Sequence, residues 1–162
     1  MSIKILLTGG TIDKSYNEFN GELDFTASYI PEMLSLGRNK TNTRIEQVLF
    51  KDSLEMNESD RQSILKACKN ATEDKILITH GTDTMVQTAQ LLGAAKLNKT
   101  IVLTGAMVPF VFKHSDALFN LGFALGALQT LSTGVYISMN GSVFDWGHVV
   151  KNLELGQFEL KK

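Results

Sequence analysis

Two short threonine-containing motifs carry the residues of this chain that are best suited to chemistry. The first is Thr8-Gly-Gly-Thr11, and the second is His80-Gly-Thr82-Asp83-Thr84-Met85. Each follows a short apolar run of the kind that forms a buried strand. A threonine hydroxyl can act as a nucleophile, but at neutral pH it needs a nearby base or a proton path. The two motifs therefore predict a reaction centre that contains hydroxyls and a carboxylate.

The groups that could activate such a hydroxyl are limited. Asp83 cannot be the base alone if it is ionised with an ordinary low pKa. A lysine held by this carboxylate could serve once the lysine pKa is lowered. Glycines at Gly9, Gly10, Gly81 and Gly105 would let backbone amides approach a ligand and stabilise an oxyanion.

The elements that must position these motifs alternate between strands and helices. Apolar or β-branched runs predict five strands, at residues 3–8, 44–50, 75–79, 100–104 and 134–139. Helical spacing predicts four helices, at residues 31–36, 57–68, 83–92 and 115–128. This alternation predicts an α/β fold of three layers, with a mostly parallel sheet flanked by helices on both faces.

Two helices have clear starting signals, whereas one long segment has none. Ser115-Asp116 is a favourable N-cap pair ahead of the apolar stripe Leu118, Leu121, Leu125 and Leu128. Asn57 and Asp60 have the spacing of a capping box. Residues 13–26 show no steady period, so we expect a long mobile loop or an irregular hairpin there, which could act as a lid.

The predicted strand order along the chain places four polar loops after four strands. These loops are Thr8-Gly-Gly-Thr11, Asp52-Ser53, His80-Gly81-Thr82-Asp83 and Gly105-Ala106-Met107. Ligands of open α/β sheets bind beyond the carboxyl ends of the strands. We therefore expect all four loops to meet at one rim.

Length and charge restrict the possible partners. The 162 residues suffice for one domain, and 16 basic residues nearly balance 17 acidic ones. This balance offers no electrostatic handle for nucleic acid or an anionic membrane, so a small-molecule substrate or a protein partner is expected. Cys68 cannot form an internal disulfide, no stretch has transmembrane length, and the first apolar run is too short for a signal peptide. Cytoplasm is the expected location.

Several other kinds of site are disfavoured by the motifs. His80, His114 and His148 lack metal-ligand spacing, so no metal site is expected. The first motif lacks the Gly-Lys-Ser/Thr ending of a P-loop and the spacing of a dinucleotide fingerprint, although a tight turn remains an alternative. The serine-hydrolase elbow is also missing.

The two motifs resemble the signatures of the bacterial-type L-asparaginases, which are amidohydrolases that use threonine. The likeness continues in order through Thr104-Gly-Ala-Met107-x-Pro109, Ser115-Asp116…Phe119-Asn120-Leu121 and Asn140-Gly141…Asp145…Lys151. It thus covers nearly the whole chain. The resemblance implies an asparaginase N-terminal-domain-like fold of the flavodoxin or Rossmann type. It also implies hydrolysis of L-asparagine to L-aspartate and ammonia through a threonine acyl-enzyme, without a metal or organic cofactor.

The resemblance assigns roles to residues of this chain. Thr11 would be the nucleophile and Tyr16 the phenol that assists it, with Tyr29 in reserve. Asp83 would orient Lys151, which activates Thr82 or a water, and the order in which the two threonines act stays open. Ser53 would bind the substrate α-carboxylate and Asp83 its α-ammonium. The expected substrate-binding residues are Gly10, Asp52, Ser53, Gly81, Thr82, Asp83 and Ala106.

The chain also departs from the pattern of the longer family members, which are about twice its length. It resembles a short branch, so we expect residues 1–162 to form a single catalytic domain without a C-terminal domain, assembled as a homo-oligomer, a dimer or a tetramer. Leu54 and Val108 replace a polar residue and an arginine that are common in long members. The substrate therefore stays open: glutamine, a D-amino acid amide or a larger amide are alternatives. A catalytically weak protein that binds aspartate or asparagine is another.

Overall fold

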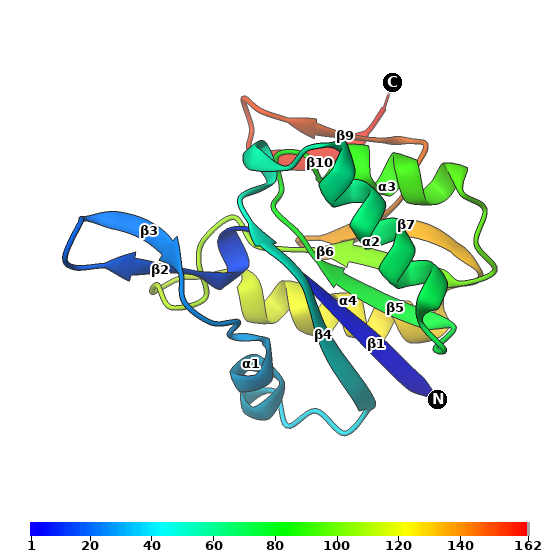
Figure 1. Cartoon of the computed structure of the whole chain (residues 1–162), viewed down its shortest axis with the longest axis horizontal. Helices are drawn as coiled ribbons and strands as arrows, with labels where there is room; N and C mark the ends of the chain where they lie inside the picture. Colours follow the sequence, from blue (N-terminus) through cyan, green and yellow to red (C-terminus); the bar gives the residue numbers. More distant parts are fainter. Residues whose placement is uncertain (162) are drawn as a thin grey trace.

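A six-stranded sheet forms the centre of the computed structural model, which describes residues 1–161 (Figure 1). Its order is β4-β1-β5-β6-β7-β8, and all neighbours are parallel except β7 and β8. The strands are β1 (Ser2–Gly9), β4 (Asn42–Lys51), β5 (Lys75–Thr79), β6 (Thr100–Thr104), β7 (Gly134–Met139) and β8 (Ser142–Asp145). The five predicted strands are confirmed. Residue 162, the end of the predicted 1–162 domain, lies outside the described residues.

Helices cover both faces of this sheet, which explains why its inner strands are almost wholly apolar. On one face, α2 (Glu58–Asn70) and α3 (Met85–Ala94) pack over side chains such as Ile76 and Ile101. On the other, α1 (Ile30–Leu36) and α4 (Ala117–Thr130) pack over Ile5, Leu77 and Val102. The predicted three-layer α/β fold is confirmed.

Two hairpins lie outside the central sheet. β2 (Lys14–Asn17) and β3 (Glu22–Phe25) form an antiparallel hairpin that projects from the body of the molecule (Figure 1). Of the two alternatives for residues 13–26, the hairpin is therefore correct. β9 (Val149–Asn152) and β10 (Gln157–Leu160) form the second hairpin, which was not among the predicted strands.

The hairpin formed by β7 and β8 was also not predicted, although the sequence contains its turn signal. Asn140 and Gly141 have φ angles of 48° and 82°, and they form the two-residue turn that joins β7 to β8. An Asn-Gly pair between apolar runs is a strong hairpin signal, because both central residues of this turn need positive φ.

The helix starts confirm some predictions and correct others. The capping box of Asn57 and Asp60 is present at α2. α3 begins at Met85, two residues later than predicted, so Thr82 and Asp83 stay in the loop before it. Asp116 makes no side-chain cap on α4, because its carboxylate binds another loop, and Leu118 is exposed rather than part of the buried stripe.

Candidate active site

The four predicted loops meet at the carboxyl edge of β4, β1, β5 and β6, where backbone packs directly on backbone. A Cβ atom at Gly10, where φ is 84°, would lie 2.3 Å from the Gly81 nitrogen. A Cβ atom at Gly81 would lie 2.6 Å from the Ser53 hydroxyl oxygen. Only glycine, which has no Cβ, permits these approaches. The two glycines therefore allow the Thr11, Ser53 and Thr82 loops to pack in direct contact.

Thr82, Asp83 and Lys151 form a hydrogen-bonded group at this rim. The Lys151 ammonium donates to the Thr82 hydroxyl at 2.8 Å and to the Asp83 carboxylate at 2.6 Å. Lys151 comes from β9, 69 residues beyond Thr82, and its side chain is 10 % exposed. The structure thus brings together Thr82, Asp83 and Lys151, which the family resemblance predicted to act on one another.

This geometry suits proton transfer. A charged lysine donates to the hydroxyl, and a neutral lysine accepts the hydroxyl proton. Asp83 holds the ammonium from the side, so Lys151 stays pointed at Thr82 in either state. Asp83 binds Lys151 through one carboxylate oxygen and is 39 % exposed, which leaves its other side open to the solvent face.

Thr11 lies at the start of a short 3₁₀ helix (Thr11–Asp13), immediately after Gly10. Ile12 and Asp13 are buried beneath it, whereas Thr11 itself is half-buried. Within residues 1–161 its hydroxyl makes no hydrogen bond to the protein. The hydroxyl of Thr8 has a different task, because it donates to the carbonyl of Thr79 and ties the end of β1 to β5.

Tyr16 is not brought to Thr11. It lies on β2 with 58 % of its surface exposed, and its hydroxyl is 3.9 Å from the position that a Cβ would take at Gly21, in the hairpin turn. The reserve residue, Tyr29, packs instead against the ring of Phe110. A contact between Tyr16 and Thr11 would require the hairpin to move, and the role of Tyr16 stays a prediction.

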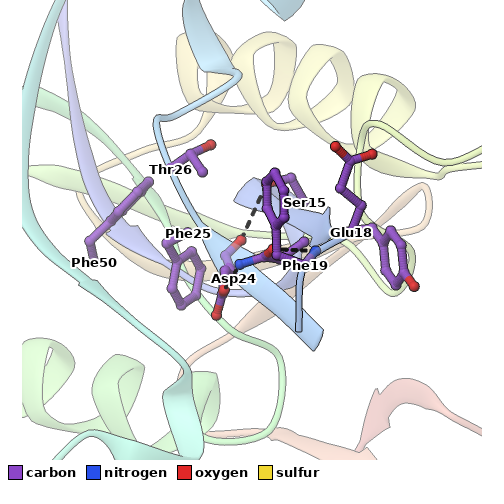
Figure 2. A pocket seen from close by; sticks show the side chains of 9 residues that line it. Ser15, Glu18, Phe19, Asp24, Phe25, Thr26 and Phe50 are labelled. Carbon is purple, nitrogen blue, oxygen red and sulfur yellow. Dashed lines mark hydrogen bonds between the residues drawn. The ribbon is translucent and has the colours of Figure 1, made fainter. Parts of the chain in front are cut away.

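A hollow of about 720 Å³ lies beside the hairpin, where Phe25 packs against Phe50 with ring centroids 5.0 Å apart (Figure 2). It is lined by residues 15–19, 24–26 and 50. Hydrogen bonds from Asn17 and Ser15 to Asp24 hold the two strands of the hairpin together beside it (Figure 2). Of the predicted catalytic residues only Tyr16 lines this space, so the hollow lies to one side of the rim.

Ser53 and Asp52 occupy the loop after β4 and have structural partners. Ser53 is 1 % exposed, and its hydroxyl accepts from the Thr84 amide at 3.3 Å, which positions the start of α3. Asp52 caps the short 3₁₀ helix Ser53–Glu55 through the Leu54 amide and forms an ion pair with Lys14 of the hairpin. Burial raises the Asp52 pKa, but the bonds from Lys14 and Leu54 outweigh burial and hold the pKa below its ordinary value.

The loop that contains Ala106 is held by Asp116 and Asn120, which were not among the predicted site residues. The Asp116 carboxylate accepts from the backbone amides of Met107 and Val108, each at 3.0 Å. Asn120 donates to Asp116 and to the Gly105 carbonyl. Burial raises the Asp116 pKa, but the bonds from these two amides and from Asn140 outweigh burial and lower it. The motif that contains Ser115-Asp116 and Asn120 was the available signal.

His80 is fully buried and has a structural role. Its Nδ1 lies 2.8 Å from the Gly81 carbonyl and its Nε2 lies 2.8 Å from the Thr88 hydroxyl. Because a carbonyl only accepts, Nδ1 carries the proton and Thr88 donates to Nε2. Burial lowers the His80 pKa to about 4.

His80 should therefore make the fold sensitive to acid. Between its ordinary pKa near 6.5 and the folded value of about 4, only the unfolded chain binds the proton, so stability falls as the pH falls. This residue should cost about 3 kcal/mol of the free energy of unfolding by pH 4. Urea titrations between pH 7 and pH 4 give the free energy of unfolding at each pH. The slope of this free energy against pH should be shallower in His80→Gln. His148→Gln, at an exposed position, should keep the wild-type slope, and equal slopes in all three proteins would contradict the assignment.

Two further findings concern the described part of the chain. Within residues 1–161, no cluster of three or more His, Cys, Asp or Glu side chains could hold a metal ion. No helix in the same range is both long and apolar enough to cross a membrane. The expectation that no metal or cofactor is needed stays an expectation.

Several known proteins share sequence similarity with nearly the whole of this chain. The family model described as "Asparaginase, N-terminal" matches residues 2–154. A "Probable L-asparaginase periplasmic" of Haemophilus influenzae is 33 % identical over 93 % of this chain and 46 % of its own length. A "Glutaminase-asparaginase" of Pseudomonas aeruginosa is 30 % identical over 88 % of this chain and 43 % of its own.

The solved structures agree with the fold. The thermostable L-asparaginase of Thermococcus kodakarensis superposes with a TM-score of 0.87 and 30 % identity, over 99 % of this chain and 51 % of that one. The chain thus spans about half the length of this structure and less than half of these two curated relatives.

Proposed function

Because this chain belongs to the asparaginase family, through a match that covers residues 2–154, we propose that it hydrolyses L-asparagine to L-aspartate and ammonia. The observation that carries the proposal is the placement of the Lys151 ammonium between the Thr82 hydroxyl and the Asp83 carboxylate. This group lies on the rim where the glycine contacts draw in the Thr11 loop. A hydroxyl nucleophile and a separate proton path are the two requirements of threonine-based amide hydrolysis.

In the proposed first step, the Thr11 hydroxyl attacks the carboxamide carbon of the substrate. We assign the attack to Thr11 because its hydroxyl has no protein partner within residues 1–161, whereas Thr82 is 5 % exposed and held by Lys151. In this step Lys151 is neutral: it takes up the Thr11 proton through Thr82 and passes it to the substrate nitrogen. The carbon–nitrogen bond then breaks, and the nitrogen leaves as ammonia. Backbone amides beside Gly10 and Gly81 support the developing oxyanion.

The second step returns the enzyme to its starting state. Lys151 and Thr82 withdraw a proton from water, whose oxygen attacks the Thr11 ester, and the proton goes back to Thr11 as aspartate leaves. One asparagine and one water thus give one aspartate and one ammonia. In this proposal Ser53 donates to the α-carboxylate, and the Asp83 oxygen not used by Lys151 accepts from the α-ammonium. Gly10, Asp52, Gly81 and Ala106 complete the substrate contacts.

Ammonia release from a panel of amides tests the substrate. L-asparagine should be hydrolysed, and L-glutamine, one methylene longer, should have a kcat/KM about 10-fold to 200-fold lower. Glutamine is nevertheless the second candidate substrate, because the Pseudomonas aeruginosa relative is named a glutaminase-asparaginase. A kcat/KM for glutamine that equals or exceeds the value for asparagine would reverse this order.

Two further amides and one binding measurement complete the test. D-asparagine places its ammonium away from Asp83 and should react slowly. An amide within a larger molecule should also react slowly if the α-carboxylate must reach Ser53. If calorimetry detects aspartate binding but no amide releases ammonia, the protein is a binding protein and the proposed enzymatic activity is wrong.

Assembly, location and domain content are also proposals. The exposed Leu118 and Phe119 lie on α4, which carries no charged residue, and they support a homo-oligomer, a dimer or a tetramer, that light scattering can test. A cytoplasmic location is proposed because Cys68 is the single cysteine of the sequence and so has no partner for an internal disulfide. The single-domain organisation of residues 1–162 stays a prediction, which the mass of the protein isolated from its natural source would test.

A further inference from the structure

Asp13 is a buried carboxylate that the proposed mechanism does not use. It ends the 3₁₀ helix that begins with Thr11, and its side chain is fully buried. Its Oδ1 accepts a hydrogen bond from the Ser28 hydroxyl at 3.0 Å and another from the Tyr29 amide at 2.9 Å. Asp13 immediately precedes β2, whereas Ser28 and Tyr29 follow β3. One carboxylate oxygen therefore joins the two ends of the projecting hairpin.

The backbone of Asp13 connects this junction to the nucleophile. Its amide donates to the Gly10 carbonyl at 3.1 Å and so closes the turn in which Thr11 lies. The neighbouring Ile12 is fully buried, and its carbonyl accepts from the Phe110 amide. A shift of the Asp13 side chain would therefore be passed to the Thr11 turn on one side and to the hairpin on the other.

Burying the Asp13 carboxylate is energetically unfavourable, because an acid group loses its hydration in the core. No ion pair among residues 1–161 includes Asp13, and its Oδ2 is buried without a hydrogen-bond partner in the same part of the chain. Burial raises the Asp13 pKa, although the bonds from Tyr29 and Ser28 oppose that rise. An unpaired acid is rarely kept in a core for stability alone, and such violations concentrate at functional sites.

We propose that Asp13 is a positioning residue, which pins both ends of the β2–β3 hairpin to the turn that holds Thr11. In this role it orients the Thr11 hydroxyl and fixes the base from which the hairpin, with Tyr16, approaches the rim. The side chain of Asp13 bonds only Ser28 and Tyr29, neither of which is a proposed substrate contact, so this side chain acts on the reacting groups rather than on substrate binding. The kinetic part of this inference rests on the proposed function.

Three substitutions separate the acceptor from the charge. Asp13→Ala removes the acceptor and should lower kcat for asparagine about 100-fold, because a displacement of about 1 Å at a nucleophile has this effect. KM should stay within about twofold, since the substitution removes no side chain that is proposed to contact the substrate and keeps the backbone bond from residue 13 to Gly10. Asp13→Asn keeps an acceptor oxygen facing Ser28 and Tyr29 and should restore kcat to within about threefold of wild type. Ser28→Ala removes one of the two bonds and should have an intermediate kcat.

Asp24→Ala supplies the matched control. Asp24 is a carboxylate of the same hairpin, but its hydrogen bonds stay within the hairpin, so kcat should be unchanged. Hydrogen exchange of the Tyr29 amide gives a readout that does not need activity. This amide should exchange faster in Asp13→Ala than in wild type or Asp13→Asn, while amides of β5 stay protected.

The outcomes distinguish the two hypotheses. An inactive wild type with faster Tyr29 exchange in Asp13→Ala would overturn the proposed function and keep the pinning role. A wild-type kcat in folded Asp13→Ala, or a kcat in Asp13→Asn as low as in Asp13→Ala, would overturn the positioning role. If Asp13→Ala does not fold, Ser28→Ala decides, and its wild-type kcat together with unchanged Tyr29 exchange would overturn the inference.

Discussion

Replacing Thr11 with valine should abolish ammonia release from asparagine, with a fall in kcat on the order of 10⁴-fold or more. Valine has nearly the shape of threonine and lacks only the hydroxyl. Since that hydroxyl makes no hydrogen bond to the protein within residues 1–161, its removal leaves no protein group unpaired. The midpoint of thermal unfolding should therefore stay within about 3 °C of wild type. Steady-state ammonia release and a thermal melt on the same sample measure both effects.

Thr26→Val is the matched control, because Thr26 is an exposed threonine that lines the hollow beside the hairpin. It should release ammonia at the wild-type rate. Mass spectrometry of acid-quenched wild type during turnover then locates the ester, which should map to the peptide that contains Thr11. An ester on Thr82 would show that Thr82, rather than Thr11, attacks the substrate. Turnover by Thr11→Val at the wild-type rate would contradict the proposed mechanism.

Much of the fold could be predicted from the sequence, because strands that are buried on both faces of a sheet appear as short apolar runs. β5 and β6 are short apolar runs because helices cover both sides of them, and the periodic leucines of α4 mark its buried face. The β9–β10 hairpin shows no such pattern, because its strands have four residues each and the turn between them carries the exposed leucines Leu153 and Leu155 instead of mainly polar residues. Its strands are defined by their pairing and by packing against α3 instead.

The site could be predicted in part for a similar reason. The carboxyl-end rule places the Thr11, Ser53 and Thr82 loops on one rim, because it depends only on strand direction. Lys151 has no local signal, and only the resemblance to a known family pointed to it. The Lys14–Asp52 ion pair and the Asp13 junction were missed, because side chains that meet across a hairpin base are set by tertiary packing rather than by periodicity.

Lys151→Met should lower kcat about 10³-fold, the range expected when a positioned acid or base is lost. Methionine keeps a stem of similar length and apolar character, but it can neither donate to Thr82 nor pair with Asp83. The half-exposed Asp83 can recover its hydration from solvent, so the fold should persist. Lys161→Met, at an exposed position just after β10, should leave kcat unchanged. The measurement is ammonia release under saturating asparagine.

A double-mutant cycle shows whether Lys151 acts through Thr82 or directly on the substrate. If the Lys151 ammonium works through the 2.8 Å contact with the Thr82 hydroxyl, each single change breaks the same proton path. Lys151→Met combined with Thr82→Val should then be no slower than the slower single variant. Fully additive losses would mean that the two residues act independently. Lys151→Arg sharpens the distinction, because arginine keeps the charge beside Asp83 but does not give up its proton near neutral pH, so kcat should stay low even where asparagine still binds.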